Sequence, residues 1–344
     1  MNHFIPRGYS PLLDLKQTEQ AIKLVKDLFE VGLSSELRLR RVTAPLFVRS
    51  GTGINDDLSG TERPVSFPVK HLNGTRVEVV QSLAKWKRMA LADYGMNEGY
   101  GIYTDMNALR PDDLLDNIHS IYVDQWDWEL VISPKDRNLD FLKSIVRRIY
   151  DVLRRTEFLI SEYYPMMEPM LPQQIEFVHS EDALAAYPNL TPKERERELA
   201  RKYGAFFLIG IGAELADGKK HDERAPDYDD WTTETGGGRR GLNGDIILWN
   251  PVLEDSFEIS SMGIRVDAET LLRQLALCGC EERKNLYWHR RLLAGDFPQS
   301  VGGGIGQSRL CMYYLRKAHI GEVQAGVWPE ELIETYKRKG IPLI

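Results

Sequence analysis

Residues 120–131 read SIYVDQWDWELV, and their β-branched and aromatic content predicts a strand. Residues 100–109 (YGIYTDMNAL) have a similar character, and the charged, turn-like residues 110–117 separate the two stretches. Two extended stretches joined in this way are typical of an antiparallel hairpin. We therefore expect a long antiparallel hairpin.

Polar residues occupy both faces of the second predicted strand. Because side chains two residues apart share a face of a strand, one face is predicted to carry Gln125, Asp127 and Glu129. The other face would carry Tyr122, Asp124, Trp126 and Trp128. Two polar rows on one strand are unusual.

Helices and strands follow one another without strict alternation in the rest of the chain. Strands are predicted at residues 75–81, 205–211, 245–249 and 256–262, and helices at 83–91, 139–163, 191–203, 269–277, 286–293 and 307–315. A helix containing Ile22 and Phe29 leads into an extended segment, residues 37–48, whose Pro45 is expected at a sheet edge or bulge. The pattern indicates an α+β fold, a mainly antiparallel sheet flanked by helices. No linker interrupts it, so we expect one domain over residues 1–344.

Composition and charge limit the classes of function. The chain has 344 residues, 42% hydrophobic and 28% charged, which is typical of a globular protein. Its formal net charge is -7, and no Lys/Arg-rich stripe is present. A nucleic-acid partner would therefore lack its usual electrostatic footprint, and none is expected.

The cysteines and the first residues bear on the compartment. Cys278, Cys280 and Cys311 form no CxxC pair, and we interpret them as unpaired thiols of a cytosolic protein. The start of the chain has no apolar export region, and no run of 18 apolar residues follows. We expect a cytoplasmic protein without a membrane partner.

Residues 302–309 read GGGIGQSR, a candidate ligand-binding stretch. Glycines let a backbone approach a ligand closely, and the N-terminus of the following helix favours anions. The stretch matches neither the P-loop nor a dinucleotide fingerprint. A flexible turn with a surface arginine, Arg309, is the alternative interpretation.

Arg110 begins the loop of the predicted hairpin and is followed by Asp112 and Asp113. Its planar guanidinium could present two donors to a phosphate. A surface arginine balanced by the two aspartates is equally plausible from these residues alone.

Charged residues elsewhere have two interpretations each. Asp245 and Glu258, within predicted strands, could be oxygen ligands of a Mg²⁺ ion that also takes substrate phosphates, or could form structural salt bridges. Lys85 and Lys87 could meet a substrate carboxylate, although solvent exposure is favoured for both. No GxSxG or HxxxH pattern occurs, which gives hydrolase chemistry little support.

Taken in order, these pieces resemble the catalytic fold of class II aminoacyl-tRNA synthetases. The segment with Pro45 resembles the first motif of that fold, LRPD (109–112) with HSIYVDQWDWE (119–129) the second, and GGGIGQSR the third. Within this superfamily the chain resembles the asparagine synthetase A family of ammonia-dependent aspartate ligases. The blocks are GINDDLSG (53–60), SLAKWKR (82–88), VDQWDWE (123–129), RAPDYDDW (224–231), LNGDI (242–246), FEISSMGIR (257–265) and GGGIGQSR, and they span nearly the whole chain.

The resemblance implies a role for each candidate residue. Arg110 and Arg309 would hold the ATP phosphates near Gly304, and Asp245 and Glu258 would lie near Mg²⁺ and the nucleotide. Asp56, Ser82, Lys87, Gln125, Asp127, Asp229, Ser260 and Arg265 would line the amino-acid pocket, with Asp56 as a candidate base for ammonium. Residues 236–240 (GGGRR) match no motif of the family.

The implied reaction activates the β-carboxylate of L-aspartate with ATP, giving β-aspartyl-AMP and pyrophosphate. Ammonia then attacks the acyl carbon and releases L-asparagine and AMP. The first motif implies a homodimer. A tRNA synthetase is the first alternative, but the chain has no room for an anticodon-binding domain. A non-catalytic amino-acid-binding protein is the second, and the presence of both arginines and both acidic residues argues against it.

Overall fold

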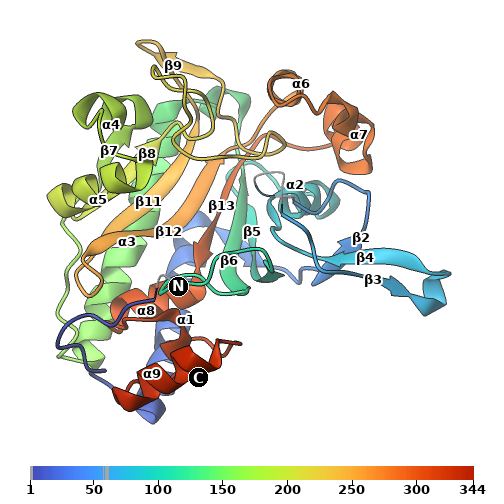
Figure 1. The fold of residues 1–344 in the computed structure, drawn as a ribbon. Helices are drawn as coiled ribbons and strands as arrows, with labels where there is room; N and C mark the ends of the chain where they lie inside the picture. The colour runs from blue at the N-terminus through green and yellow to red at the C-terminus, as the bar shows by residue number, and fades with distance from the viewer. Residues whose placement is uncertain (1–2, 57, 59–61) are drawn as a thin grey trace.

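The computed structural model describes residues 3–56, 58 and 62–344. Its centre is an eight-stranded sheet (Figure 1). The strands lie in the order β1 (Leu39–Arg41), β5 (Gly101–Leu109), β6 (Tyr122–Val131), β13 (Ser300–Gly306), β12 (Asp255–Ile264), β11 (Asn243–Asn250), β8 (Ala205–Ile209) and β7 (Glu176–His179). Only the edge pairs, β1 with β5 and β7 with β8, are parallel among the strands described. The expected α+β class with a mainly antiparallel sheet is confirmed.

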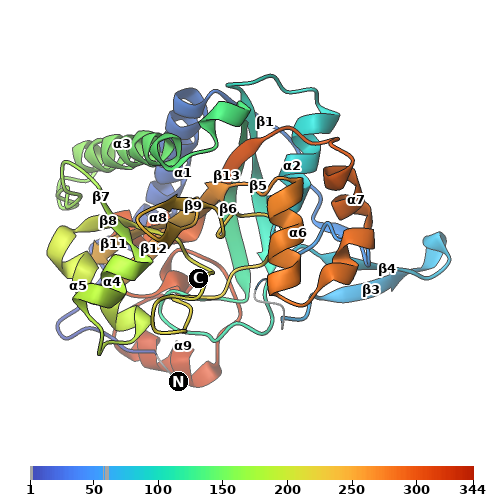
Figure 2. The same cartoon turned by 90° about the horizontal axis from the view of Figure 1, so that it is seen from above.

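Three helices pack on one face of this sheet and form the main core. They are α1 (Leu15–Leu37), α3 (Leu139–Tyr163) and α8 (Gln307–Tyr314), and α1 and α3 lie side by side (Figure 2). The rings of Phe29 on α1 and Trp126 on β6 are 4.8 Å apart between centroids. Trp126 and Trp128 lie on one face of β6, as the two-residue period predicted, and both are buried in this core.

The remaining helices lie around the sheet. α2 (Ala84–Asp93), α6 (Ala268–Leu277) and α7 (Tyr287–Leu293) contribute to a second apolar cluster that includes Leu271, Trp288 and Met89. α4 (Ser180–Ala186) and α5 (Pro192–Tyr203) lie at the opposite end of the sheet, and α9 (Glu330–Arg338) lies near the C-terminus (Figure 1). Thr191 caps α5 in a capping box with Pro192 at the first helical position, as its sequence indicates. Within the described chain, no helix is long and apolar enough to cross a membrane.

Two small sheets complete the fold. β2 (Phe47–Arg49), β4 (Thr75–Val79) and β3 (Ser66–Val69) form an arm that projects from the body (Figure 1). β9 (Glu234–Gly236) and β10 (Arg239–Arg240) form a short hairpin from the GGGRR segment that matched no motif.

The segment at residues 37–48 differs from the expectation. α1 continues to Leu37, and the chain then forms two short strands, β1 and β2, which belong to different sheets. Pro45 lies between them, outside both strands. Proline has no N–H to donate to a sheet, so it marks the point where the chain leaves one sheet for the other.

Candidate active site

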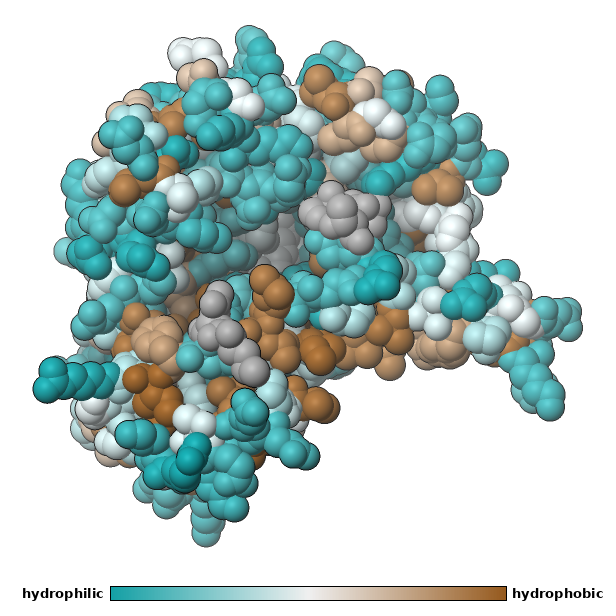
Figure 3. Space-filling view, in the orientation of Figure 1, coloured by the Kyte–Doolittle hydropathy of each residue, from teal (hydrophilic) through white to brown (hydrophobic). Residues whose placement is uncertain are grey.

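A cavity of about 610 Å³ opens on the sheet face opposite α1 and α3. Figure 3 shows the molecule hollowed at its centre, with hydrophilic residues above the hollow and a strip of hydrophobic residues below it. The predicted site residues that line the cavity are Ser82, Lys87, Arg110, Gln125, Asp127, Asp229, Glu258, Ser260, Arg265, Gly304 and Arg309. Segments far apart in the sequence therefore meet in one place, while Asp56 and Asp245 lie outside this lining.

The glycine-rich stretch forms the floor of the cavity. Gly302 and Gly304 on β13 pair with Glu129 and Asp127 on β6. A Cβ atom on Gly304 would lie 2.2 Å from Oε1 of Gln125, and one on Gly302 would lie 1.8 Å from Oε2 of Glu129. The polar row of β6 thus occupies the space above the bare backbone of β13. The interpretation of this stretch as a flexible turn is wrong, because it is a central strand.

Lys87 and Asp127 form a buried ion pair in the cavity wall. The Lys87 Nζ lies 2.9 Å from Asp127 Oδ1 and donates to the carbonyl oxygen of Gly303 at 2.8 Å. Burial lowers the pKa of Lys87 against the opposing effect of Asp127. The second oxygen of Asp127, Oδ2, is buried and has no hydrogen-bond partner in the described chain. This oxygen can accept a hydrogen bond from a ligand.

The solvent-exposed interpretation of Lys85 and Lys87 is wrong. Both side chains are buried, and the Lys85 Nζ lies 3.0 Å from Asp227 Oδ2. Asp227 also contacts His289. Because Asp227 belongs to the RAPDYDDW block, this second buried pair fixes α2 against that block.

A buried network around Arg265 forms the adjoining wall. The Arg265 Nε and Nη2 donate to the two carboxylate oxygens of Glu129 at 2.9 and 2.8 Å, and Nη1 donates to Asp229 Oδ1. The Ser300 hydroxyl donates to Glu129 Oε1 at 2.7 Å. Burial raises the pKa of Asp229 despite Arg265. Glu129 was not predicted as a site residue, although it belongs to the polar row of β6.

Arg110 and Arg309 approach the cavity from different elements. Arg110 follows the end of β5, and its Nη2 donates to the carbonyl oxygen of Gln81 at 3.1 Å. Arg309 lies in the first turn of α8, and its Nη1 donates to the carbonyl oxygen of Glu258 at 3.0 Å. A guanidinium has five N–H donors, so these contacts leave donors available to an anionic ligand.

Asp245 and Glu258 lie on the adjacent strands β11 and β12. Arg224, which lines the cavity, donates from Nη2 to Asp245 Oδ2. Burial raises the pKa of Asp245, whereas Arg309 and Lys193 outweigh burial and lower the pKa of Glu258. Arg224 was missed as a site residue, although it begins the RAPDYDDW block.

Asp245 and Glu258 are the candidate oxygen ligands for a Mg²⁺ ion. No group of three His, Cys, Asp or Glu residues suited to a metal occurs among the residues that the structure describes. Mg²⁺ in nucleotide sites, however, takes only one or two carboxylates together with substrate phosphates and water. Asp245 Oδ1 is buried without a hydrogen-bond partner in the described chain. An unpartnered carboxylate oxygen of this kind fits such an ion.

Asp56 is buried beside the cavity lining. It is 3% exposed, and its Oδ1 accepts a hydrogen bond from the backbone N–H of Leu58 at 3.2 Å. Burial, and secondarily the charge of Asp56, raise the pKa of Tyr228, which lines the cavity. Asp56 therefore adjoins the cavity through Tyr228. Part of its GINDDLSG block, residues 57 and 59–61, lies outside the described residues.

Ser260 and Ser261 lie on opposite faces of β12. Ser260 pairs with Ile246 and Ile305, which are buried in the main core, although its position also borders the cavity. Ser261 pairs with Asp245 and Gly304, so its side chain shares their face. Ser261 is a cavity residue that the sequence did not single out.

The fold of this protein is that of the catalytic domains of class II aminoacyl-tRNA synthetases, as two solved structures show. The asparaginyl-tRNA synthetase of Entamoeba histolytica, solved with asparaginyl-adenylate, has a similar fold with a TM-score of 0.66 at 15% identity, over 90% of this chain and 66% of that one. The asparaginyl-tRNA synthetase of Pyrococcus horikoshii, also with asparaginyl-adenylate, gives 0.66 at 17% identity, over 91% of this chain and 70% of that one. The chain thus spans about two thirds of these synthetases.

Within that class, sequence similarity identifies the family. The profile of the aspartate-ammonia ligase family matches residues 16–340. The aspartate–ammonia ligase of Parabacteroides distasonis is 62% identical over 98% of both chains. That of Clostridium perfringens is 54% identical over 99% of both chains. The chain belongs to the aspartate–ammonia ligase family.

Proposed function

We propose that this protein makes L-asparagine from L-aspartate, ammonia and ATP through a β-aspartyl-AMP intermediate. The observation that carries the proposal is one cavity with two chemically different ends. Lys87, Asp127, Asp229 and Arg265 give one end charges of both signs, which suit a zwitterionic amino acid. Arg110 and Arg309 give the other end donors for phosphates. Full-length similarity to aspartate–ammonia ligases supports the same assignment.

Aspartate must bind with its β-carboxylate toward the nucleotide. Asp127 and Asp229 would hold the α-ammonium group, and the unpartnered Oδ2 of Asp127 supports this role. Lys87 or Arg265 would hold the α-carboxylate. Ser82, Gln125 and Ser260 complete the proposed pocket, and all three border the cavity.

Adenylation gives the β-carboxylate of aspartate a good leaving group, AMP, in place of a poor one, its own oxygen. A carboxylate oxygen of aspartate attacks the α-phosphorus, and the bond from that phosphorus to pyrophosphate breaks. Arg110 and Arg309, beside the backbone of Gly304, would stabilise the charge that develops on the phosphate oxygens. Asp245 and Glu258 would hold a Mg²⁺ ion, which would neutralise phosphate charge when bound.

Ammonia completes the reaction by attacking the acyl carbon, and the carbon–oxygen bond to AMP breaks. The nucleophile must be neutral, so ammonium has to lose a proton first. Asp56 is the proposed base, and its position next to Tyr228 of the cavity wall supports this role.

We also propose a cytoplasmic homodimer. Three exposed apolar side chains are of the kind that a second copy would cover: Val31 on α1 and Phe47 and Phe67 on the arm. The three cysteines are free thiols, which suits a reducing compartment. Sedimentation should give a mass twice that of one chain, and a single-chain mass at assay concentrations would contradict the dimer.

The activity is tested with purified protein, ATP, Mg²⁺, aspartate and ammonium. Asparagine, AMP and pyrophosphate should appear in equal amounts. Release of ADP and phosphate instead would contradict the adenylate mechanism, and charging of tRNA would favour a synthetase. Binding of aspartate without turnover would favour a non-catalytic protein.

A further inference from the structure

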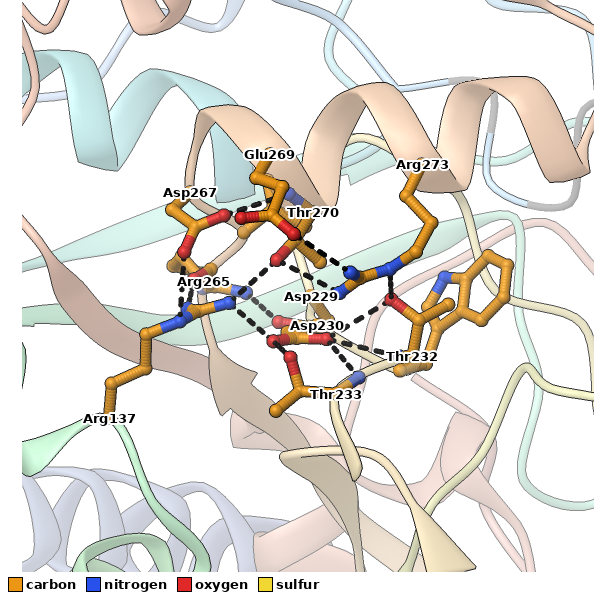
Figure 4. Close-up of polar contacts among 12 residues, drawn as sticks. Arg137, Asp229, Asp230, Thr232, Thr233, Arg265, Asp267, Glu269, Thr270 and Arg273 are labelled. Carbon is orange, nitrogen blue, oxygen red and sulfur yellow. Dashed lines mark hydrogen bonds and ion pairs between the residues drawn. The ribbon is translucent and has the colours of Figure 1, made fainter. Parts of the chain in front are cut away.

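A second cluster of polar residues adjoins Asp229 and Arg265, where α6 begins (Figure 4). One member of the cluster is Arg137, which follows the 3-10 helix Pro134–Asp136 and precedes α3. Its neighbours come from α6 and from the loop between β8 and β9, which carries Asp229 and Asp230. The cluster therefore joins three segments that are far apart in the sequence.

Arg137 contacts both of the other segments through one guanidinium. Its side chain is 12% exposed. Nη1 donates to the backbone carbonyl of Arg265, and Nη2 donates to Asp230 Oδ2 and, at 3.0 Å, to the hydroxyl of Thr270. Nε lies 3.2 Å from Asp267 Oδ2, and Asp267 is the N-cap of α6. A planar fork with five donors can make such a set of contacts, whereas a lysine cannot.

Asp230 turns the loop so that its neighbour faces the cavity. Its carboxylate is buried and accepts hydrogen bonds from the backbone N–H groups of Thr232 and Thr233 at 3.0 and 2.9 Å. The backbone carbonyl of Asp229 accepts a hydrogen bond from Gln274 Nε2 at 2.9 Å. The side chain of Asp229 is thereby left to pair with Arg265 in the cavity wall.

Arg137 thus contacts both segments that carry this ion pair. Asp229 and Arg265 are backbone partners in an isolated antiparallel bridge. The guanidinium of Arg137 binds the carbonyl of Arg265 on one side of the bridge and the side chain of Asp230 on the other. We propose that Arg137 is a positioning residue that fixes the spacing of Asp229 and Arg265 and so shapes the amino-acid pocket. This inference rests on the proposed role of Asp229 and Arg265 in binding aspartate.

The effect should be confined to the amino-acid end of the cavity. Arg110 lies after β5 and Arg309 lies on α8, and the contacts of Arg137 reach neither element in the described chain. Loss of the guanidinium would leave the buried carboxylate of Asp230 and the carbonyl of Arg265 each without one partner. The bridge between Asp229 and Arg265 would then relax. The α-ammonium and α-carboxylate groups of bound aspartate would no longer find these two side chains in the right places.

The test varies aspartate and ATP separately in steady-state assays of Arg137→Met and Arg137→Lys. Arg137→Met should raise the KM for aspartate about tenfold, and Arg137→Lys should raise it less. The KM for ATP should change by less than about twofold in both variants. Arg273→Met is the matched control, because Arg273 belongs to the same cluster but bonds to Thr232 and Thr270 rather than to Asp230 or Arg265. It should leave both constants near those of the wild type.

Several results would overturn the proposal. They are an unchanged KM for aspartate in folded Arg137→Met, an equal rise in both KM values, or the same rise in Arg273→Met. If circular dichroism shows that Arg137→Met does not fold, the comparison passes to Arg137→Lys and Asp230→Asn, which should show the same selective rise. A wild-type protein that makes no asparagine would refute the proposed function instead. The positioning role would then be judged by aspartate binding in calorimetry, which Arg137→Met should weaken and Arg273→Met should not.

Discussion

Arg110 reaches the cavity from the end of β5 with most of its donors unused by the described chain. We expect Arg110→Ala to lower kcat/KM about 100-fold or more, because it removes a cation placed for charge that develops on phosphate. The melting temperature should stay close to that of the wild type. Arg197→Ala, which removes an ion pair with Asp255 away from the cavity lining, serves as the control in the same asparagine assay. Normal turnover by Arg110→Ala would show that the nucleotide binds elsewhere.

Gly304 is a position where any side chain would collide with the proposed pocket. In Gly304→Ala, the new Cβ would lie 2.2 Å from Gln125 Oε1 and 2.8 Å from Asp127 Oδ1. We expect the KM for aspartate to rise about tenfold or more, since both side chains must move. Gly326→Ala is the control, because its Cβ would meet Trp328 at an ordinary 3.4 Å. If both variants had the same KM for aspartate, Gly304 would not lie against the amino-acid pocket.

At the residue scale, the sequence predicted what depends on a simple period and missed what depends on distant neighbours. The polar face of β6 follows from the two-residue period of a strand. Burial of Lys87 could not be predicted, because its partners, Asp127 and Gly303, come from remote parts of the chain. The face of β12 on which Ser261 lies could not be predicted. A register shift between Ile246 and Ile247 interrupts the two-residue period of the pairing, and local sequence does not reveal such a shift.

The helix that carries Arg309 is capped from another element. α8 begins after Gly306, which has no side chain to cap it. Asp124 on β6 accepts from the backbone N–H of Ser308 at 3.0 Å and from its hydroxyl at 2.8 Å. We expect Asp124→Ala to lower the free energy of unfolding by about 2 kcal/mol in urea denaturation. Ser308→Ala keeps the backbone bond and should cost less, and a reversed order would contradict the capping role.

This contact explains an oddity of the sequence at the element scale. Asp124 shares a face of β6 with Trp126 and Trp128, and its carboxylate caps a helix 184 residues away along the chain and also pairs with Lys26. Helix and strand positions were largely predictable from periodicity. α3 has the predicted bounds, whereas β13 was not predicted as a strand because glycine is disfavoured there.

The two ends of the chain meet around His319. The Nε2 atom of His319 lies 3.1 Å from Nδ1 of His3, and its ring packs against Trp328 and Tyr336. Burial lowers the pKa of His319 to about 3. The unfolded chain binds this proton below a pH of about 6.5, whereas the folded chain binds it only near pH 3. His319 therefore makes the protein less stable as the pH falls through that window.

His319→Gln should reduce the stability lost between pH 7 and pH 5 by up to about 2 kcal/mol, measured by urea denaturation at both values. His71→Gln, at an exposed position, is the control. An unchanged pH dependence in His319→Gln would show that other groups cause the loss.

A single unfolding transition for the wild type would support the proposal that residues 1–344 form one domain.

At the scale of the whole molecule, the α+β class followed from the order of the predicted elements. The strand order did not, because the sheet places β13 between β6 and β12 and adds parallel strands at both edges. Such pairings depend on contacts across the whole chain. Resemblance to a known family supplied the site assignment that local patterns left open, and that assignment stays a prediction.

The bare floor of the cavity determines where substrate preference could be altered. Engineers usually widen a pocket by trimming large side chains, and Gly302, Gly303 and Gly304 have none to trim. Redesign for a longer or shorter amino acid would have to act on β6, on α2 or on the loop that carries Asp229. Each of these is bound into a buried ion pair, so a change of preference would require replacing charges in pairs.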